Sequence, residues 1–259
     1  MEKKAILVVS FGTTSEKTCL ETIGAIESDV KAAFPSWDVH RAFTSNLVIR
    51  QLAQRNISVN TPEQALQMLW NDGFRQVWIL PTFLAPGGEY RRLLQRIALW
   101  REQFSLLAIA KPLLYDSGDI QAMAQILAET YPAADGNAIV FMGHGTDGDG
   151  NESYGALEAA IHSLGASHTF IALLKGQPDL ESVLTRIQGR YASVSLVPLM
   201  LSVGSHAAKH MAGEDSHSWK NRCTAAGLEV KCIMTGLGES PQVRRIYLKN
   251  LQKEIHADR

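Results

Sequence analysis

The chain has 259 residues, of which 46% are hydrophobic and 20% charged, and its formal net charge is -1. These values are typical of a globular enzyme with one large or two ordinary domains. The near-zero charge argues against nucleic acid or an anionic membrane as partner, and no apolar run approaches the length of a membrane span. The first residues are too polar for a signal peptide, and the three cysteines form no CxxC pair, so we expect a cytoplasmic protein with reduced thiols.

Strands and helices alternate along the first half of the sequence. Residues 5–10 form a short apolar run typical of a strand buried on both faces, and a helix at 17–34 follows. The next predicted elements are a strand at 39–44, a helix at 47–55, a helix from Pro62 that Gly73 ends, a strand at 76–83, a helix from Glu89 or Tyr90, a strand at 106–114 and a helix at 117–131. Such short steps predict a parallel sheet with helices on both faces.

The same order restarts at Ala138. The predicted elements are a strand from 138, a helix at 152–164, a strand at 168–174, a helix at 178–188, a strand at 193–200, a helix after Gly204 and a last helix at 241–254. Residues 214–220 are interpreted as an exposed loop anchored by Trp219. We therefore predict an α/β fold of two similar domains, 1–125 and 126–259, with the C-terminal helix as an element that can complete the first domain.

The two halves also match residue by residue. Residues 5–13 align with 138–146, which puts Phe11 over His144, and residues 81–89 align with 198–206, which puts Glu89 over His206. A duplication of this kind predicts a pseudo-twofold molecule with a cleft between the halves. Two imidazoles and a carboxylate that converge there, His144, His206 and Glu89, are a plausible ligand set for a divalent metal.

Gly143-His144-Gly145 is the most informative triplet. It follows a buried strand, where open α/β sheets bind their ligands, and its glycines let a planar substrate approach the backbone closely. An ordinary tight turn explains the triplet alone equally well. Neither GxGxxG nor GxxxxGK[ST] occurs, and Asp147 and Asp149 would repel phosphate, so no nucleotide is expected.

His206 is a weak candidate for a metal ligand unless the alignment of the two halves is taken into account. His206 and His210 are four residues apart and share one face of a helix, which by itself favours a capping or surface role. The equivalence of His206 with Glu89 favours a metal site instead. No GxSxG elbow is present, so nucleophilic catalysis is not predicted.

Several segments match a known family in order and spacing. They are Leu7-Val8-Val9-Ser10-Phe11-Gly12-Thr13, Arg41-Ala42-Phe43-Thr44-Ser45, Met142-Gly143-His144-Gly145, Pro198-Leu199-Met200-Leu201, Gly204-Ser205-His206, Ser218-Trp219-Lys220 and Gly236-Leu237-Gly238-Glu239. From about residue 3 to about residue 252, the sequence resembles the anaerobic cobalt chelatases of cobalamin biosynthesis. These sirohydrochlorin cobaltochelatases belong to the ATP-independent group that includes ferrochelatase.

The resemblance implies two similar domains facing a cleft that holds a tetrapyrrole. It implies that His144 is the proton acceptor and a metal ligand and that His206 is a second ligand, to which we add Glu89. The metal is a substrate, cobalt first with nickel or iron as alternatives, and a homo-oligomer is left open. The substrate-binding residues that we expect are Ser10, Phe11, Gly12, Thr13, Leu84, Gly87, Gly143, Gly145, Met200 and Gly204, with Arg50, Arg91 and Arg92 at the carboxylate rim of the tetrapyrrole.

Two positions depart from the family pattern. Phe83 stands where the family has a histidine, and Lys175, three residues before Pro178, stands where it has a glutamate ligand. A lysine repels a divalent cation at neutral pH. Either Glu89 supplies the carboxylate, or the metal, substrate or activity has changed. The alternatives to a chelatase are a tetrapyrrole or metal carrier on the same scaffold and a metal-independent α/β enzyme that uses His144 as general base.

Overall fold

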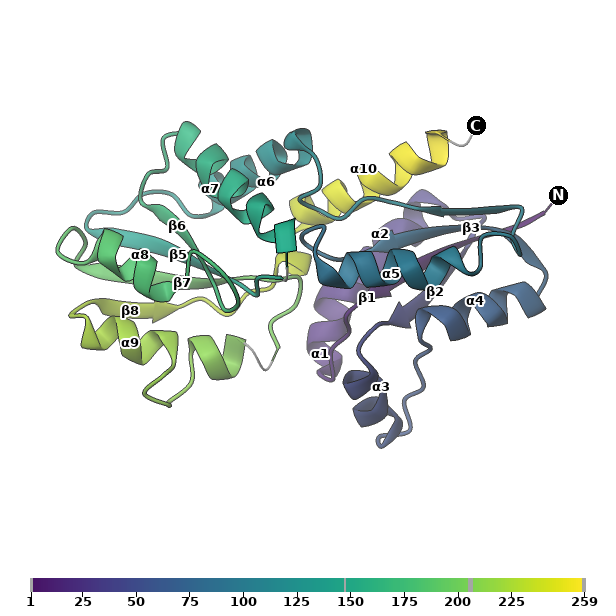
Figure 1. Cartoon of the computed structure of the whole chain (residues 1–259), viewed down its shortest axis with the longest axis horizontal. Coiled ribbons are helices and arrows are strands. Elements are labelled where there is room, and N and C mark those ends of the chain that lie inside the picture. The colour runs from purple at the N-terminus through teal and green to yellow at the C-terminus, as the bar shows by residue number, and fades with distance from the viewer. Residues whose placement is uncertain (1, 147, 205–206, 258–259) are drawn as a thin grey trace. The chain divides into compact units, whose positions relative to one another are not determined.

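The computed structural model describes residues 2–146, 148–204 and 207–257, which form two compact units (Figure 1). The first unit contains the chain up to Leu113 and again from Pro241 onward, and the second unit contains Leu114–Ser240. Each unit is built around one parallel sheet. No helix in the described ranges is long and apolar enough to cross a membrane.

The first sheet has the strand order β2-β1-β3-β4. Its strands are β1 (Lys3–Ser10), β2 (Asp38–Phe43), β3 (Phe74–Pro81) and β4 (Leu106–Ile109). One face packs on α4 (Pro62–Asn71) and α5 (Gly88–Ala98), and the other on α2 (Ala25–Ala33) and α10 (Pro241–Ala257). The shorter helical segments are α1 (Glu16–Cys19), η1 (Leu20–Gly24) and α3 (Asn46–Ala53). Because β1 is apolar on both faces, it lies in the middle of these layers.

The second sheet repeats this order as β6-β5-β7-β8. Its strands are β5 (Asn137–Gly143), β6 (Thr169–Leu173), β7 (Ser193–Leu199) and β8 (Glu229–Cys232). The core on one face joins them to α8 (Leu180–Ile187), η3 (Ala207–Met211) and α9 (Trp219–Ala225). The remaining helical segments are α6 (Ser117–Thr130), which packs against α7 (Glu152–Ser163), and the short turns η2 (Gly148–Asn151) and η4 (Leu237–Glu239).

The strand registers confirm the duplicated α/β unit. Pro81 of β3 pairs with Val9 of β1, and Pro198 of β7 pairs with Met142 of β5, so the aligned prolines occupy equivalent positions. The same face of each central strand enters the core, through Ala5, Leu7 and Val9 in one unit and Ala138, Val140 and Met142 in the other. The pseudo-twofold relation and the cleft stay predictions.

The unit boundaries differ from the predicted 1–125 and 126–259. Helix α6 follows β4 in the chain but belongs to the second unit, where it packs against α7. Helix α10 follows β8 but belongs to the first unit, where it packs against α2 and β3. Each unit is therefore covered by the helix that follows the last strand of the other. The sequence pointed to the C-terminal helix as the element that completes the first domain, but it did not predict that α6 belongs to the second.

Two stretches depart from the predicted elements. Strand β4 ends at Ile109, so residues 110–114 continue in irregular structure. Residues 214–217 are exposed as predicted, but Trp219, whose side chain is 4% exposed, belongs to α9. Ser218 caps this helix by accepting a hydrogen bond from the Asn221 amide. The edge strand β8 is not predicted, because it is short and only partly buried.

Helix α10 closes the first unit through a buried hydroxyl. The Tyr247 side chain is fully buried, and its hydroxyl donates a hydrogen bond to the Thr82 carbonyl oxygen at 3.1 Å, with the Phe83 carbonyl oxygen at 3.4 Å. Arg244 adds an ion pair with Asp29 of α2, at 2.6 Å between Nε and Oδ2. The C-terminal helix therefore stabilises the segment that leads from β3 to α5.

We expect Tyr247→Phe to lower the free energy of unfolding by about 1–2 kcal/mol, because it leaves a buried carbonyl without its donor. Urea denaturation measures the change. Tyr191→Phe, which removes the same hydroxyl from a half-exposed ring, is the control and should cost less than about 0.5 kcal/mol. Equal losses in the two variants would contradict this role for the buried hydroxyl.

Candidate functional site

His144 is the first residue after β5, at the carboxyl edge of the second sheet. Its side chain is half-buried, and its Nδ1 atom lies 3.1 Å from the Gly145 carbonyl oxygen. In the first unit, Phe11 is the first residue after β1, so the two occupy equivalent strand ends as predicted. This edge is where parallel α/β sheets present groups to a ligand.

Packing requires both glycines beside His144. A Cβ atom built on Gly143 would lie 2.7 Å from the Leu173 side chain and 2.9 Å from the Tyr154 ring. Gly145 has a φ of +72°, and a Cβ atom there would lie 1.8 Å from the Lys175 carbonyl oxygen. Both glycines are buried, so close packing of the loop accounts for them, and their contact with substrate stays a prediction.

Lys175 lies directly beside His144. The Lys175 amide donates a hydrogen bond to the His144 carbonyl oxygen at 3.0 Å, and the Leu174 amide donates to the Gly143 carbonyl oxygen at 2.9 Å. The Lys175 side chain is exposed and forms no ion pair with any residue that the structure describes. The departure from the family pattern therefore lies at a residue whose backbone is bonded to the predicted proton acceptor and whose charged side chain is exposed.

Two residues that the sequence analysis did not single out hold the other side of this loop. The Asn151 Oδ1 atom accepts a hydrogen bond from the Thr146 amide at 2.8 Å. Tyr154 is 5% exposed, and burial raises the pKa of its hydroxyl to about 12 although a hydrogen bond from the Gly145 backbone opposes the shift. Their only sequence signal is their position, at and just after the start of the helix that follows the glycine loop.

The loop after β1 contains one exposed apolar side chain. Phe11 is 49% exposed, whereas Ser10 is fully buried and its hydroxyl accepts a hydrogen bond from the Thr82 hydroxyl at 2.8 Å. Gly12 has a φ of +100° and lies against the Phe43 ring, which would clash with a Cβ atom there. Thr13 is buried, and its hydroxyl accepts from the Ser15 amide at 3.2 Å. Of the four predicted substrate residues here, only Phe11 presents a large exposed side chain.

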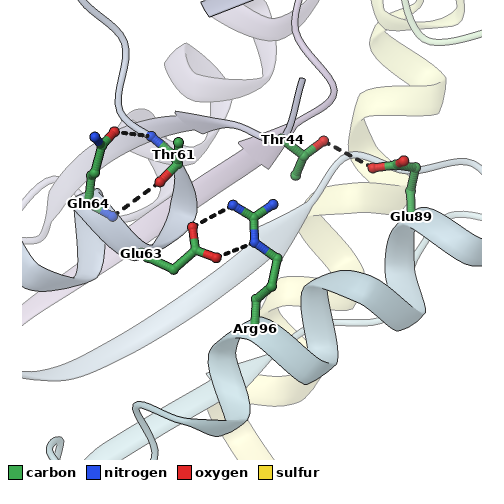
Figure 2. Close-up of polar contacts among 6 residues, drawn as sticks. All are labelled: Thr44, Thr61, Glu63, Gln64, Glu89 and Arg96. Atoms are coloured by element: carbon green, nitrogen blue, oxygen red, sulfur yellow. Dashed lines mark hydrogen bonds and ion pairs between the residues drawn. The ribbon is translucent and has the colours of Figure 1, made fainter. Parts of the chain in front are cut away.

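Glu89 stands in the first turn of α5, in the segment that follows β3. Its carboxylate accepts a hydrogen bond from the Thr44 hydroxyl at 3.2 Å (Figure 2). It also forms an ion pair with Arg92. Arg50, Arg91 and Arg92 are all exposed, and Arg92 would have to leave Glu89 to bind a substrate carboxylate. Glu89 is held in place by its own unit.

The position of α5 is itself fixed by an ion pair. Arg96 of α5 binds both carboxylate oxygens of Glu63 in the first turn of α4 (Figure 2). Burial opposes ionisation of Glu63, but the hydrogen bonds from Arg96 and the backbone hold the pKa of this carboxyl below its usual value. Thr61 caps α4 by accepting a hydrogen bond from the Gln64 amide, and the Thr61 amide donates to the Gln64 side-chain oxygen at 2.9 Å (Figure 2).

The other predicted residues lie in varied surroundings. Leu84 is half-buried, and Gly87 is buried as the N-cap of α5. Met200 packs against the core of the second unit, while Gly204 has open space where a Cβ atom would stand. Phe83, in the place of a family histidine, belongs to the core of the first unit.

The predicted ligand set is only partly described. His206 lies outside the described residues, and the described ones contain no group of three or more histidine, cysteine, aspartate or glutamate side chains that could hold a metal ion. His144 and Glu89 lie in different units, each with its own local partners. The three-ligand site therefore stays a prediction.

A family comparison covers nearly the whole chain. The family model described as cobalt chelatase (CbiK) matches residues 4–256. The chain belongs to the cobalt chelatase family. The resemblance predicted from the sequence motifs is thereby confirmed.

Two relatives in the cobalt chelatase family match this chain over almost their full lengths. The sirohydrochlorin cobaltochelatase of Salmonella typhimurium is 35% identical over 259 residues, which cover 98% of this chain and 97% of the relative. The sirohydrochlorin cobaltochelatase CbiKC of Nitratidesulfovibrio vulgaris is 33% identical over 262 residues, covering 99% and 92%.

Solved chelatase structures have the same fold. SirB from Bacillus subtilis with Fe³⁺ has a TM-score of 0.71 at 15% identity, covering 99% of this chain and 97% of that one. The sirohydrochlorin chelatase SirB from Bacillus subtilis subspecies spizizenii in complex with cobalt has a TM-score of 0.66 at 14% identity, covering 98% and 96%. At these identities the likeness concerns the fold alone.

Proposed function

We propose that this chain is an ATP-independent chelatase that inserts a divalent metal, cobalt first, into sirohydrochlorin. The observation that carries the proposal is the match to the cobalt chelatase family from residue 4 to residue 256. Two sirohydrochlorin cobaltochelatases, at 35% and 33% identity over nearly their whole lengths, support the same substrate. The metal is a substrate of this reaction.

His144 is the proposed proton acceptor. Metal insertion removes two pyrrole protons from the macrocycle, and a neutral imidazole accepts a proton near pH 7. The half-buried ring stands at a strand end, where it is not part of the hydrophobic core. An imidazole also binds cobalt, nickel or iron in the divalent state, so His144 can serve as a metal ligand before it accepts a proton.

The proposed contacts to the tetrapyrrole use an apolar ring and cations. Phe11 is exposed and can stack on the flat face of a macrocycle, which buries apolar area. Sirohydrochlorin is ringed by carboxylates, and the exposed Arg50 and Arg91 can donate paired hydrogen bonds to them. Ser10, Gly12 and Thr13 support this loop from within the unit.

A carrier is the second candidate, and Lys175 favours it. The Lys175 backbone is hydrogen-bonded to His144, and a lysine in the place of a carboxylate ligand adds a positive charge that disfavours a divalent cation. A tetrapyrrole carrier on the same scaffold would keep the substrate contacts while losing turnover.

One assay separates the two functions. The protein is incubated anaerobically with sirohydrochlorin and with cobalt, nickel or iron in turn, and the absorbance of the macrocycle is followed. Turnover with at least one metal supports the chelatase, and the fastest metal identifies the preferred substrate. A stoichiometric spectral change without turnover supports the carrier. No change at all contradicts both and favours a metal-independent enzyme.

The source of the carboxylate ligand can be tested by cobalt titration. If Glu89 is the ligand, Glu89→Gln should weaken cobalt binding by at least about tenfold, and Lys175→Glu should leave it equal or stronger. If Lys175 has abolished the site instead, the wild type should bind cobalt weakly and Lys175→Glu should create binding. Glu102→Gln, at an exposed carboxylate, is the matched control. Unchanged affinity in both site variants would exclude both residues from the site.

A further inference from the structure

The backbone that supports His144 is hydrogen-bonded on two sides. On one side, the carbonyl oxygens of Gly143 and His144 accept hydrogen bonds from the amides of Leu174 and Lys175, which extend the β5–β6 pairing by two residues. This pairing fixes the carbonyl groups of the loop. It leaves the amides of the following residues, Gly145 and Thr146, to find other partners.

Side chains from η2 and α7 supply those partners. The Tyr154 hydroxyl accepts from the Gly145 backbone, and the Asn151 carbonyl oxygen accepts from the Thr146 amide. The Tyr154 ring also lies against Gly143, so this one residue contacts both glycines that flank His144. With a pKa near 12, the Tyr154 hydroxyl stays neutral at physiological pH and does not compete with His144 for protons.

Asn151 links the His144 loop to the next strand end. Its Nδ2 atom lies only 2.3 Å from where a Cβ atom would stand on Gly176, the residue after Lys175. Gly176 has a φ of +103°, which a side chain would rarely tolerate. The amide of Asn151 therefore fills space that a glycine leaves open, while its oxygen holds Thr146.

We propose that Asn151 and Tyr154 are positioning residues that hold the His144 loop by its amides and so orient the imidazole for proton transfer. This inference rests on the proposed role of His144. Proton transfer depends steeply on the distance and direction between the two groups, so a loop that is free to rotate slows the reaction without weakening substrate binding.

The test compares kcat and KM for sirohydrochlorin at saturating cobalt, each at the variant's own pH optimum. Tyr154→Phe keeps the ring against Gly143 and removes only the hydroxyl, and Asn151→Leu removes the acceptor. Each should lower kcat on the order of tenfold with KM unchanged. Asn151→Asp keeps an acceptor oxygen and should restore most of kcat, which separates positioning from a loss of folding.

Tyr191→Phe is the matched control, because Tyr191 packs on the same unit's core through its ring. It should leave kcat unchanged. Unchanged kcat in Tyr154→Phe and Asn151→Leu, or a change in KM alone, would overturn the proposal, and so would failure of Asn151→Asp to recover activity.

A second readout does not need turnover. The histidine ring signals of metal-free protein are recorded by NMR and the His144 signals are assigned with His144→Ala. They should shift or broaden in Tyr154→Phe and Asn151→Leu but not in Tyr191→Phe. Unaltered His144 signals would overturn the positioning role even if the wild type proves inactive, whereas altered signals with an inactive wild type would refute only the proposed function.

Discussion

His144→Ala is expected to lower the rate of cobalt insertion by ~10²–10⁴-fold, the range typical of a general base. The reason is that His144 is the predicted acceptor of the pyrrole protons and also a predicted ligand of the incoming metal. Its ring stands outside the core cluster of the second unit, so removing it should leave the fold intact. Anaerobic absorbance measurements of metal insertion give the rate, and circular dichroism checks the fold.

His256→Ala is the control for this experiment, because His256 is an exposed histidine near the end of α10. It should keep normal turnover. A His144→Ala variant that retained near-normal turnover would show that another group accepts the protons. The proposal would then have to be rebuilt around a different base.

Gly145→Ala should be the most damaging substitution of a single methyl group in the second unit. The new Cβ atom would lie 1.8 Å from the Lys175 carbonyl oxygen, at a φ of +72° that alanine rarely adopts. Either the loop or the strand end must move, so we expect the free energy of unfolding to fall by about 2–4 kcal/mol. Because His144 precedes this residue, turnover should fall on the order of 10²-fold as well. Urea denaturation and the insertion assay measure the two losses.

Gly155→Ala is the control, and it should raise the free energy of unfolding where Gly145→Ala lowers it. Gly155 is exposed on α7, and a Cβ atom there would meet nothing within 4 Å beyond its chain neighbours and the nearby backbone of its own helix. Alanine should therefore stabilise the helix by about 0.5–1 kcal/mol. If Gly145→Ala were as stable as the wild type, the close contact between Gly145 and Lys175 would not exist in the protein.

Much of the fold could be predicted because the two halves of the sequence contain the same apolar strand segments in the same order. The runs that begin at Ala5 and Ala138 are apolar on both faces, and each becomes a central strand flanked by the same neighbours. The aligned Pro81 and Pro198 take equivalent register positions. Local periodicity is enough for such elements, since burial on both faces leaves a continuous apolar signature.

Other features of the fold and of the candidate site depend on tertiary contacts, which the hydrophobic periodicity of the sequence does not show. Trp219 follows a polar segment, and its burial depends on core residues that lie far from it in the sequence. Ser10 and Phe11 are neighbours in one motif, yet one is buried and the other exposed. The side chains of Asn151 and Tyr154 accept hydrogen bonds from backbone amides of the His144 loop. The sequence spacing of these residues does not reveal such contacts.

Because α6 belongs to the second unit and α10 to the first, the two units differ in when they can fold during synthesis. During synthesis the strands of the first sheet emerge early, but α10, which covers one of its faces and satisfies the Thr82 carbonyl, emerges only after the whole of Leu114–Ser240. The second unit is one continuous segment and can fold as soon as it has been synthesised. The first unit lacks α10 on one face of its sheet until synthesis reaches the end of the chain. A gene cut after Leu113 would separate the first sheet from its own covering helix, while a circular permutant that starts at Pro241 would make both units contiguous for the first time.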